Sequence, residues 1–163
     1  MTPETARCDL QATPAPVSPV RRSRAGSSPA VLGRLQGTVL VAEDTGDLRE
    51  LAVLYLKSFG LGVIEAVNGA EAVTLALRDQ PDAILMDLEM PVLGGLEAAA
   101  QLRQSTYGGA IVALTGHSAA SVRAQALAAG CNDLLSKPVS RAPLHAALER
   151  ALRAPFGAAG TRS

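Results

Sequence analysis

Acidic residues, a hydroxyl and a lysine stand at four places in this sequence, each directly after or at the end of a short strand-like run. These runs are 39–42 before Glu43-Asp44, 83–86 before Asp87, 110–114 before Thr115 and 133–136 before Lys137. A short apolar run bounded by turn-forming residues is typical of a strand buried on both faces of a parallel sheet. The carboxyl ends of such strands meet at one edge, where open α/β sheets bind ligands. We therefore expect these side chains to form one site.

The chemistry of such a site follows from the residue types. Three carboxylates, Glu43, Asp44 and Asp87, repel one another and need a cation, and oxygen donors of this kind suit Mg²⁺. An ionised aspartate beside that metal can attack phosphorus and form an acyl phosphate. Lys137 supplies a positive charge for phosphoryl oxygens and Thr115 a hydroxyl donor. Phosphoryl transfer needs mainly positioning and charge neutralisation, which this set provides. In the simplest alternative, Asp87 only caps the turn that follows it.

Helical patterns alternate with the strand-like runs through most of the chain. Strands are expected at 39–42, 62–66, 83–87, 110–114 and 133–136, and helices at about 47–59, 69–79, 95–104, 118–130 and 141–153. The fourth helix is expected to start at either Ser118 or Ser121. Asp47 is predicted to cap the first helix, and the second is predicted to bury Val73, Ala76 and Leu77. Short connections and strict alternation predict a doubly wound α/β fold, a five-stranded parallel sheet with helices on both faces.

Composition narrows the class of protein. The 163 residues carry 15 basic and 15 acidic side chains, so no basic surface for nucleic acid is expected. Cys8 and Cys131 are isolated, which predicts neither a disulfide framework nor a zinc site. No leader-like apolar run follows the N-terminal basic residues, and no stretch is apolar enough to span a bilayer. We expect a cytoplasmic protein that neither binds nucleic acid nor inserts into a membrane.

The two ends of the chain differ from the centre. Residues 1–37 are rich in Pro, Ala, Ser and Arg without periodicity, so they cannot bury enough apolar area to offset the entropy of ordering. They are predicted to be a disordered arm, and 154–163 a disordered tail. The folded domain is predicted at 38–153.

Two histidines, a cysteine and a tyrosine lie outside the four strand ends. His117 is expected to be exposed in the loop after the fourth strand, and His145 to lie on the surface of the last helix. Cys131 is expected to be a small packed residue, and Tyr107 a loop residue without a role.

The combination of motifs resembles a known family. The stretch 38–153 resembles the receiver domain of two-component response regulators, the CheY-like family. The resemblance rests on Glu43-Asp44, Met86-Asp87-Leu88-Glu89-Met90-Pro91 with Gly94-Gly95, Ala113-Leu114-Thr115 and Ser136-Lys137-Pro138. It implies a flavodoxin-like (βα)5 fold in which the strands, numbered along the chain, have the order 2-1-3-4-5.

The resemblance assigns roles to the acidic residues. It implies that Asp87 is the phosphorylated residue, that Asp44 binds Mg²⁺ directly and that Glu43 binds it mostly through water. Glu89 stands where the family uses a backbone carbonyl as a metal ligand. The side chain at this position faces the phosphoryl site in the family and influences the lifetime of the phosphate.

The resemblance also implies which residues change conformation on phosphorylation, here called the switch. Thr115 corresponds to the hydroxyl that moves toward the phosphoryl group, Lys137 to the conserved lysine, and Pro138 to the proline that often follows a cis bond. One position departs from the family pattern: Leu134 stands where Tyr or Phe is frequent. Leucine has no ring with a polar tip to rotate, so this half of the switch is expected to differ.

These roles imply a function. A sensor histidine kinase or a histidine phosphotransfer protein is expected to donate a phosphoryl group to Asp87, and the domain to catalyse its own transfer and dephosphorylation with Mg²⁺. This activity is that of a phosphoacceptor module and not of an enzyme with a separate substrate. Only about ten residues follow the last helix, so a single-domain regulator is expected, whose output is contact with an unknown protein or onward transfer of the phosphate.

Other classes fit less well. An aspartate-based phosphatase of the haloacid dehalogenase type needs Asp-x-Asp, whereas Glu89 stands at the third position and no cap segment is present. A flavin carrier would need a phosphate loop where Glu43-Asp44 repels phosphate. An unphosphorylated receiver-like scaffold would not need Asp44, Asp87 and Lys137 together. A further alternative is a receiver detached from a hybrid kinase, in which 1–37 would be a linker. This alternative concerns the context of the domain and not its chemistry.

Overall fold

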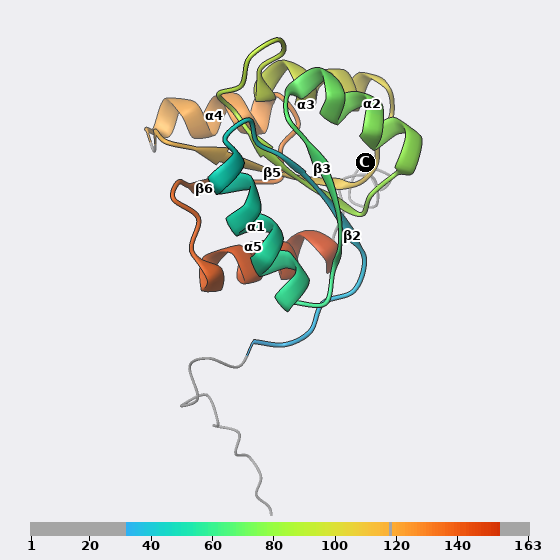
Figure 1. Cartoon of the computed structure of the whole chain (residues 1–163). Coiled ribbons are helices and arrows are strands. Elements are labelled where there is room, and N and C mark those ends of the chain that lie inside the picture. Colours follow the sequence, from blue (N-terminus) through green and yellow to red (C-terminus); the bar gives the residue numbers. More distant parts are fainter. Residues whose placement is uncertain (1–31, 118, 154–163) are drawn as a thin grey trace, which may run out of the picture. The chain divides into compact units, whose positions relative to one another are not determined.

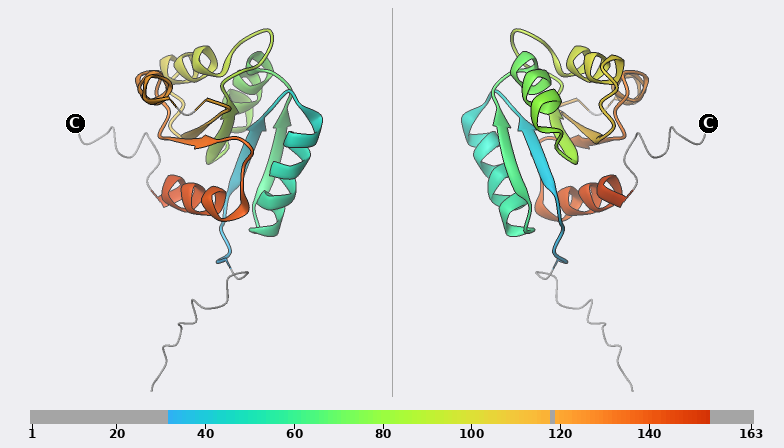
Figure 2. Two further views of the ribbon diagram at one scale, coloured as in Figure 1. Left: turned by 90° about the vertical axis from the view of Figure 1, so that its left-hand side faces the viewer. Right: turned by 90° about the vertical axis from the view of Figure 1, so that its right-hand side faces the viewer.

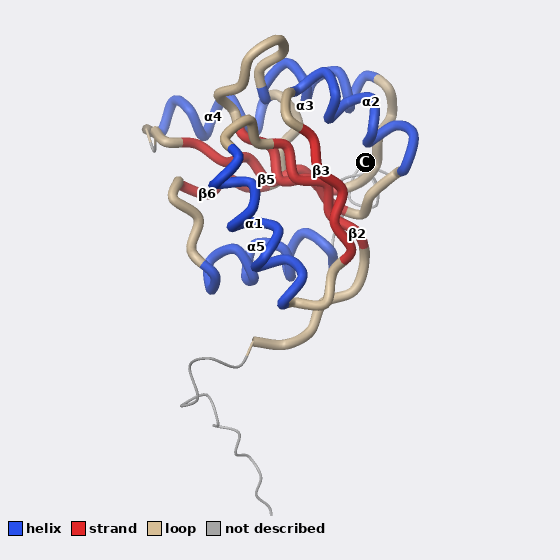
Figure 3. The backbone as a smooth tube through the Cα atoms, viewed as in Figure 1, coloured by secondary structure: helices blue, strands red, loops and turns tan. Residues whose placement is uncertain are grey.

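Strands and helices alternate throughout the part of the chain that is described, residues 32–117 and 119–153 of a computed structural model (Figures 1 and 3). The strands are β2 (Thr38–Ala42), β3 (Gly62–Ala66), β4 (Ala83–Asp87), β5 (Ala110–Thr115) and β6 (Asp133–Ser136). The helices are α1 (Gly46–Ser58), α2 (Gly69–Asp79), α3 (Gly95–Gln104), α4 (Ala120–Ala128) and α5 (Arg141–Arg153). These bounds agree with the sequence prediction to within one or two residues, and the start of α4 is resolved at Ala120.

The strands form one parallel sheet in the order β3-β2-β4-β5-β6. Numbered along the chain, this is the predicted order 2-1-3-4-5, so the predicted fold class is confirmed. Helices α1 and α5 cover one face of the sheet, and α2, α3 and α4 cover the other (Figures 1 and 2). The chain changes direction across the sheet between β2 and β4, which makes their carboxyl ends the switch point.

The three central strands are buried because helices cover both faces. All of β4 and β5 is buried, whereas β3 and β6 at the edges are partly exposed. On the face covered by α2, α3 and α4 the helices contribute mainly small side chains, namely Ala72, Ala76, Ala98, Ala99 and Ala126. Alanines allow a helix to lie close to the sheet, so the core is dense although large aromatic residues are scarce.

Two local predictions about helices are wrong. α1 begins one residue before Asp47, with Thr45 in the N-cap position and no side-chain capping bond, so Asp47 lies in the first turn instead. There its carboxylate still interacts favourably with the helix dipole. Leu77 is 36% exposed, because α2 turns the side that carries Ala72 and Ala76 toward the core.

His145 and Tyr107 are both buried, which contradicts the predictions of a surface histidine and a loop residue without a role. Nε2 of His145 donates to the carbonyl of Gly33 at 2.6 Å, and its ring packs edge-on against Phe59. The Tyr107 hydroxyl donates to the carbonyl of Pro81 at 2.7 Å. In each case a carbonyl distant in sequence satisfies the polar tip, which allows the ring to be buried. The prediction of a packed Cys131 is confirmed.

Contacts with the domain begin before the predicted boundary at 38. The N–H of Leu35 donates to the carbonyl of Phe59 at 2.8 Å, and the carbonyl of Gly37 accepts from Gly62 at 2.9 Å. The other residues assigned to the arm, 1–31, and the tail 154–163 lie outside the described part of the chain.

Replacement of Gly95 tests how closely α3 approaches the end of β4. A Cβ at Gly95 would collide with the main-chain oxygen of Asp87, so Gly95→Ala should lower the free energy of unfolding by about 1–3 kcal/mol. Gly46→Ala is the matched control, because a Cβ there meets no atom within 4 Å and should leave stability unchanged or raise it by up to about 1 kcal/mol. Urea unfolding of both variants is the measurement, and equal stabilities would contradict the close contact.

Candidate functional site

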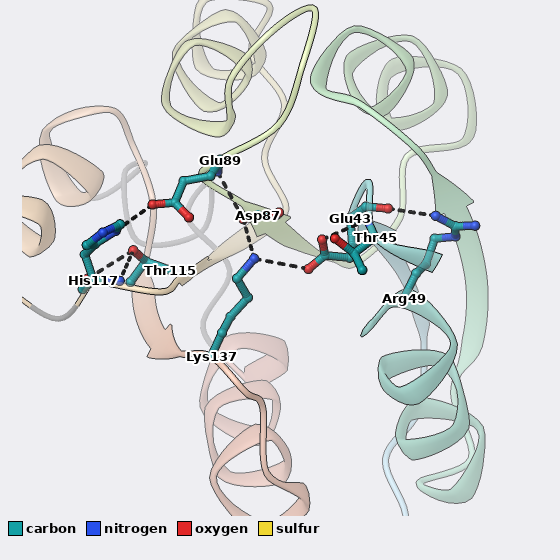
Figure 4. Close-up of polar contacts among 8 residues, drawn as sticks. All are labelled: Glu43, Thr45, Arg49, Asp87, Glu89, Thr115, His117 and Lys137. Atoms are coloured by element: carbon teal, nitrogen blue, oxygen red, sulfur yellow. Dashed lines mark hydrogen bonds and ion pairs between the residues drawn. The ribbon is translucent and has the colours of Figure 1, made fainter. Parts of the chain in front are cut away.

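The predicted residues converge at the carboxyl edge of the sheet (Figure 4). Asp87 is the last residue of β4 and is fully buried. Lys137 follows β6, and its Nζ lies 3.1 Å from Oδ1 of Asp87 and 3.5 Å from Oε2 of Glu43. Parallel strands thus bring together side chains that are up to 94 positions apart in sequence.

The two carboxylate oxygens of Asp87 have different surroundings. Oδ1 is held by the Lys137 ion pair and by the N–H of Glu89, which donates at 3.0 Å. Oδ2 is buried and has no hydrogen-bond partner among the described residues. An unpartnered buried acceptor costs about 1–3 kcal/mol, and more when it is charged. Such an oxygen is suited to a ligand that brings positive charge.

A metal ion fits this position. Glu43, Asp44 and Asp87 each offer an oxygen, and these oxygens lie within 4.8 Å of one another. Glu43 and Asp87 are buried and Asp44 is exposed, so the cluster opens to solvent on the Asp44 side. A set of carboxylate oxygens with room for water is the environment that Mg²⁺ prefers. The unpartnered Oδ2 of Asp87 is an observation independent of the cluster, and it supports the same assignment.

The charges in the site shift two pKa values. Burial raises the pKa of Glu43 to about 7; the N–H of Thr45 opposes this, and neighbouring Asp87 adds to it. Burial alone would lower the pKa of Lys137, but the hydrogen bond and charge of Asp87, together with Glu43, outweigh burial and raise it. Lys137 therefore remains charged, while Glu43 is only partly ionised near neutral pH without a metal.

Thr115 lies beside the site but its hydroxyl is engaged elsewhere. Oγ1 donates to the carbonyl of His117 at 3.0 Å and accepts from the N–H of His117 at 2.9 Å. To donate to a group on Asp87, this hydroxyl must therefore give up its bond to the carbonyl of His117.

The side chain of Glu89 points toward the loop after β5 (Figure 4). Its Oε2 lies 2.6 Å from Nδ1 of His117, and both side chains are exposed. The three-carboxylate group does not include Glu89. His117 is exposed as predicted, but its link to Glu89 was missed, because nothing in the local sequence pairs residues 28 positions apart.

Two further residues that shape the site were missed. The N–H of Thr45 donates to Oε1 of Glu43 at 3.1 Å. Nη1 of Arg49 donates to the main-chain oxygen of Glu43 at 2.9 Å, and its Nε lies 3.3 Å from Oε2 of Glu65. A positive charge near the start of a helix interacts unfavourably with the helix dipole. The position of Arg49 in the first turns of α1 was therefore the available sequence signal that its side chain has a compensating partner nearby.

The switch region agrees with part of the resemblance. The Lys137–Pro138 peptide bond is cis, as implied. Leu134 is partly buried and packs against the core on the side of α2, α3 and α4. Gly116 leaves the site open, since an added Cβ there would meet only Oε1 of Glu89, at 3.7 Å.

Comparison with known proteins identifies the family. Residues 39–149 match the response regulator receiver domain family, and the chain belongs to it. The transcriptional regulatory protein PrrA of Mycobacterium tuberculosis is 36% identical over 115 residues, which cover 71% of this chain and 49% of PrrA.

Solved structures agree with the family assignment. The receiver domain of the sensor histidine kinase PA1611 from Pseudomonas aeruginosa, described with a magnesium ion in its active-site cleft, is 35% identical with a TM-score of 0.68, over 73% of this chain and 99% of that one. Chemotaxis protein CheY4 of Vibrio cholerae is 29% identical with a TM-score of 0.68, over 72% of this chain and 100% of that one.

The relatives correct one expectation about partners. PrrA is a transcriptional regulatory protein, so the expectation that nucleic acid plays no part is wrong. That expectation rested on the balanced charge of this chain alone. The chain spans about half the length of the curated relatives it matches. For the same reason the single-domain prediction is not confirmed. No helix in the described residues is both long and apolar enough to cross a membrane.

The raised pKa of Glu43 predicts a pH dependence of stability in the metal-free protein. The folded state keeps a proton on Glu43 up to about pH 7, whereas the unfolded chain releases it near the ordinary value of 4.5. Between these values the folded state binds more protons, so the free energy of unfolding should fall as the pH rises from about 4.5 to about 7. The shift in the pKa of Glu43 corresponds to a decrease in the free energy of unfolding on the order of 3 kcal/mol.

Urea unfolding in EDTA across this pH range measures the effect. Glu43→Gln should remove this component of the slope, whereas Glu50→Gln, at an exposed position of α1, should retain it. Parallel pH profiles for wild type and Glu43→Gln would show that Glu43 titrates normally in the folded state.

Proposed function

We propose that Asp87 accepts a phosphoryl group from a phosphohistidine of a partner protein. The observation that carries the proposal is the asymmetry of the Asp87 carboxylate. Lys137 and the N–H of Glu89 hold Oδ1, while Oδ2 has no partner among the described residues. One oxygen of this carboxylate lies within 4.8 Å of oxygens of Glu43 and Asp44. The carboxylate is thus fixed in orientation next to a place for a cation, which is what a nucleophile for phosphorus needs.

The transfer exchanges one bond for another. An Asp87 oxygen forms a bond to phosphorus as the phosphorus–nitrogen bond of the donor breaks, and the electron pair returns to the histidine ring. Mg²⁺ held by Glu43, Asp44 and Asp87 would neutralise charge on the phosphoryl oxygens. Lys137 already lies 3.1 Å from Oδ1 and can donate to a phosphoryl oxygen after transfer. The N–H of Glu89 keeps the carboxylate in place throughout.

Phosphorylation would change the conformation of the protein through the hydroxyl of Thr115. Its hydroxyl donates to His117 in this structure, and a phosphoryl oxygen on Asp87 is a stronger, charged acceptor. Exchange of one acceptor for the other would pull on the loop between β5 and α4. Leu134 is packed against the core and has no polar tip, so we place the conformational change in this loop. Hydrolysis of the acyl phosphate at the same site would return the protein to the resting state, without a separate substrate.

Addition of Mg²⁺ and beryllofluoride, a mimic of the phosphoryl group, tests the proposal. Backbone amide NMR shifts should change at Asp87, Thr115 and Lys137 in wild type, because the mimic contacts all three. Asp87→Asn, which keeps the volume of the side chain, should abolish these changes. Asp79→Ala, at an exposed position of α2, is the matched control and should respond as wild type does.

The extent of the shifts tests the switch. Changes that continue into α4 would show that the β5–α4 loop transmits the signal with leucine at position 134. A wild-type protein that gives no response would refute the phosphoacceptor role and leave a scaffold with the fold alone. Steady turnover of phosphate esters would instead favour a phosphatase.

A further inference from the structure

We propose that Arg49 is a positioning residue of the metal site, which sets the direction in which Asp44 enters it. This inference rests on the proposed function, since it concerns the binding of Mg²⁺ by the same carboxylates. Arg49 is not a ligand, and its guanidinium acts on the main chain of the turn that carries the ligands.

The guanidinium of Arg49 connects three elements. Arg49 lies in the first turns of α1, and its Nη1 donates to the main-chain oxygen of Glu43 directly after β2 (Figure 4). Its Nε pairs with Glu65 on β3. The side chain is only 20% exposed, so it is held within the structure. The planar fork of arginine makes both bonds at once in a fixed geometry, which the ammonium of lysine does not provide.

The bond to Glu43 acts directly on Asp44. The carbonyl of Glu43 and the N–H of Asp44 belong to one planar peptide group, so fixing the oxygen fixes the plane from which the Asp44 chain continues. The N–H of Thr45 fixes the other side of this turn by its bond to the Glu43 carboxylate. Asp44 itself is exposed, and neither a hydrogen bond nor an ion pair of its carboxylate is observed with the described residues. The direction of its side chain therefore depends on the backbone of the turn.

The charge of Arg49 and its geometry have opposite effects on metal binding. A positive charge close to the carboxylates repels a divalent cation, so its removal would tighten binding if charge were the only contribution. The fork holds the turn in the arrangement that brings the three oxygens within 4.8 Å, so its removal would weaken binding if positioning dominates. The sign of the change therefore separates the two roles.

Calorimetric titration with Mg²⁺ at pH 8, where Glu43 is ionised, measures the change. Arg49→Gln should bind Mg²⁺ at least tenfold more weakly than wild type, the usual effect of losing a partner that orients metal ligands. Arg49→Lys keeps the charge without the fork and should also bind several-fold more weakly. Arg78→Gln, which removes an exposed arginine paired with Asp79 on α2, is the matched control and should bind as wild type does.

Each outcome decides between the roles. Equal or tighter binding in Arg49→Gln would overturn the proposal, and so would wild-type affinity in Arg49→Lys. If Arg49→Gln does not fold, Arg49→Lys alone gives the answer, and metal-free melting curves show which variants are folded. A wild-type protein that does not bind Mg²⁺ would refute the proposed function, whereas wild-type binding with no loss in the variants would refute only the role of Arg49.

Discussion

The ion pair of buried Asp87 with Lys137 is the interaction on which the rest of the site depends. Lys137 offsets only part of the negative charge of three carboxylates, so the metal-free site carries a net negative charge. Asp87 itself is fully buried, so solvent stabilises its charge little. The raised pKa of Glu43 has the same origin, since its burial and the neighbouring carboxylate disfavour a further negative charge. The sheet supplies the geometry for this arrangement, because its central strands all end at one edge.

The strand ends and the residues on them could be predicted from the sequence because both depend on local patterns. Buried parallel strands are short and apolar, and the first polar residue after each one marks the edge where ligands bind. Asp87, Lys137 and Glu43 were placed together on that basis, and the structure brings them within hydrogen-bonding distance. Their roles in phosphoryl transfer remain predictions, whereas membership of the receiver family is established by comparison.

Other contacts could not be predicted because their two partners lie on different elements. His145 and Tyr107 are buried through carbonyls 112 and 26 positions away, and neither pairing leaves a trace in the local pattern. The link between Glu89 and His117 and the bond of Arg49 to a main-chain oxygen are of the same kind. Composition failed for a different reason, since the charge of this chain does not describe longer relatives such as PrrA, of which the matched region covers only 49%.

The unpartnered oxygen of Asp87 has a consequence for the signals to which the domain would respond. On the proposed function, a phosphoryl group would bring more negative charge to a site that already lacks positive charge, so its transfer to Asp87 would require a bound cation. The domain would then respond to two inputs together, the supply of divalent metal and the state of its donor, and neither alone would change its output. In the terms of circuit logic, such a site would act as a coincidence detector of metal and donor.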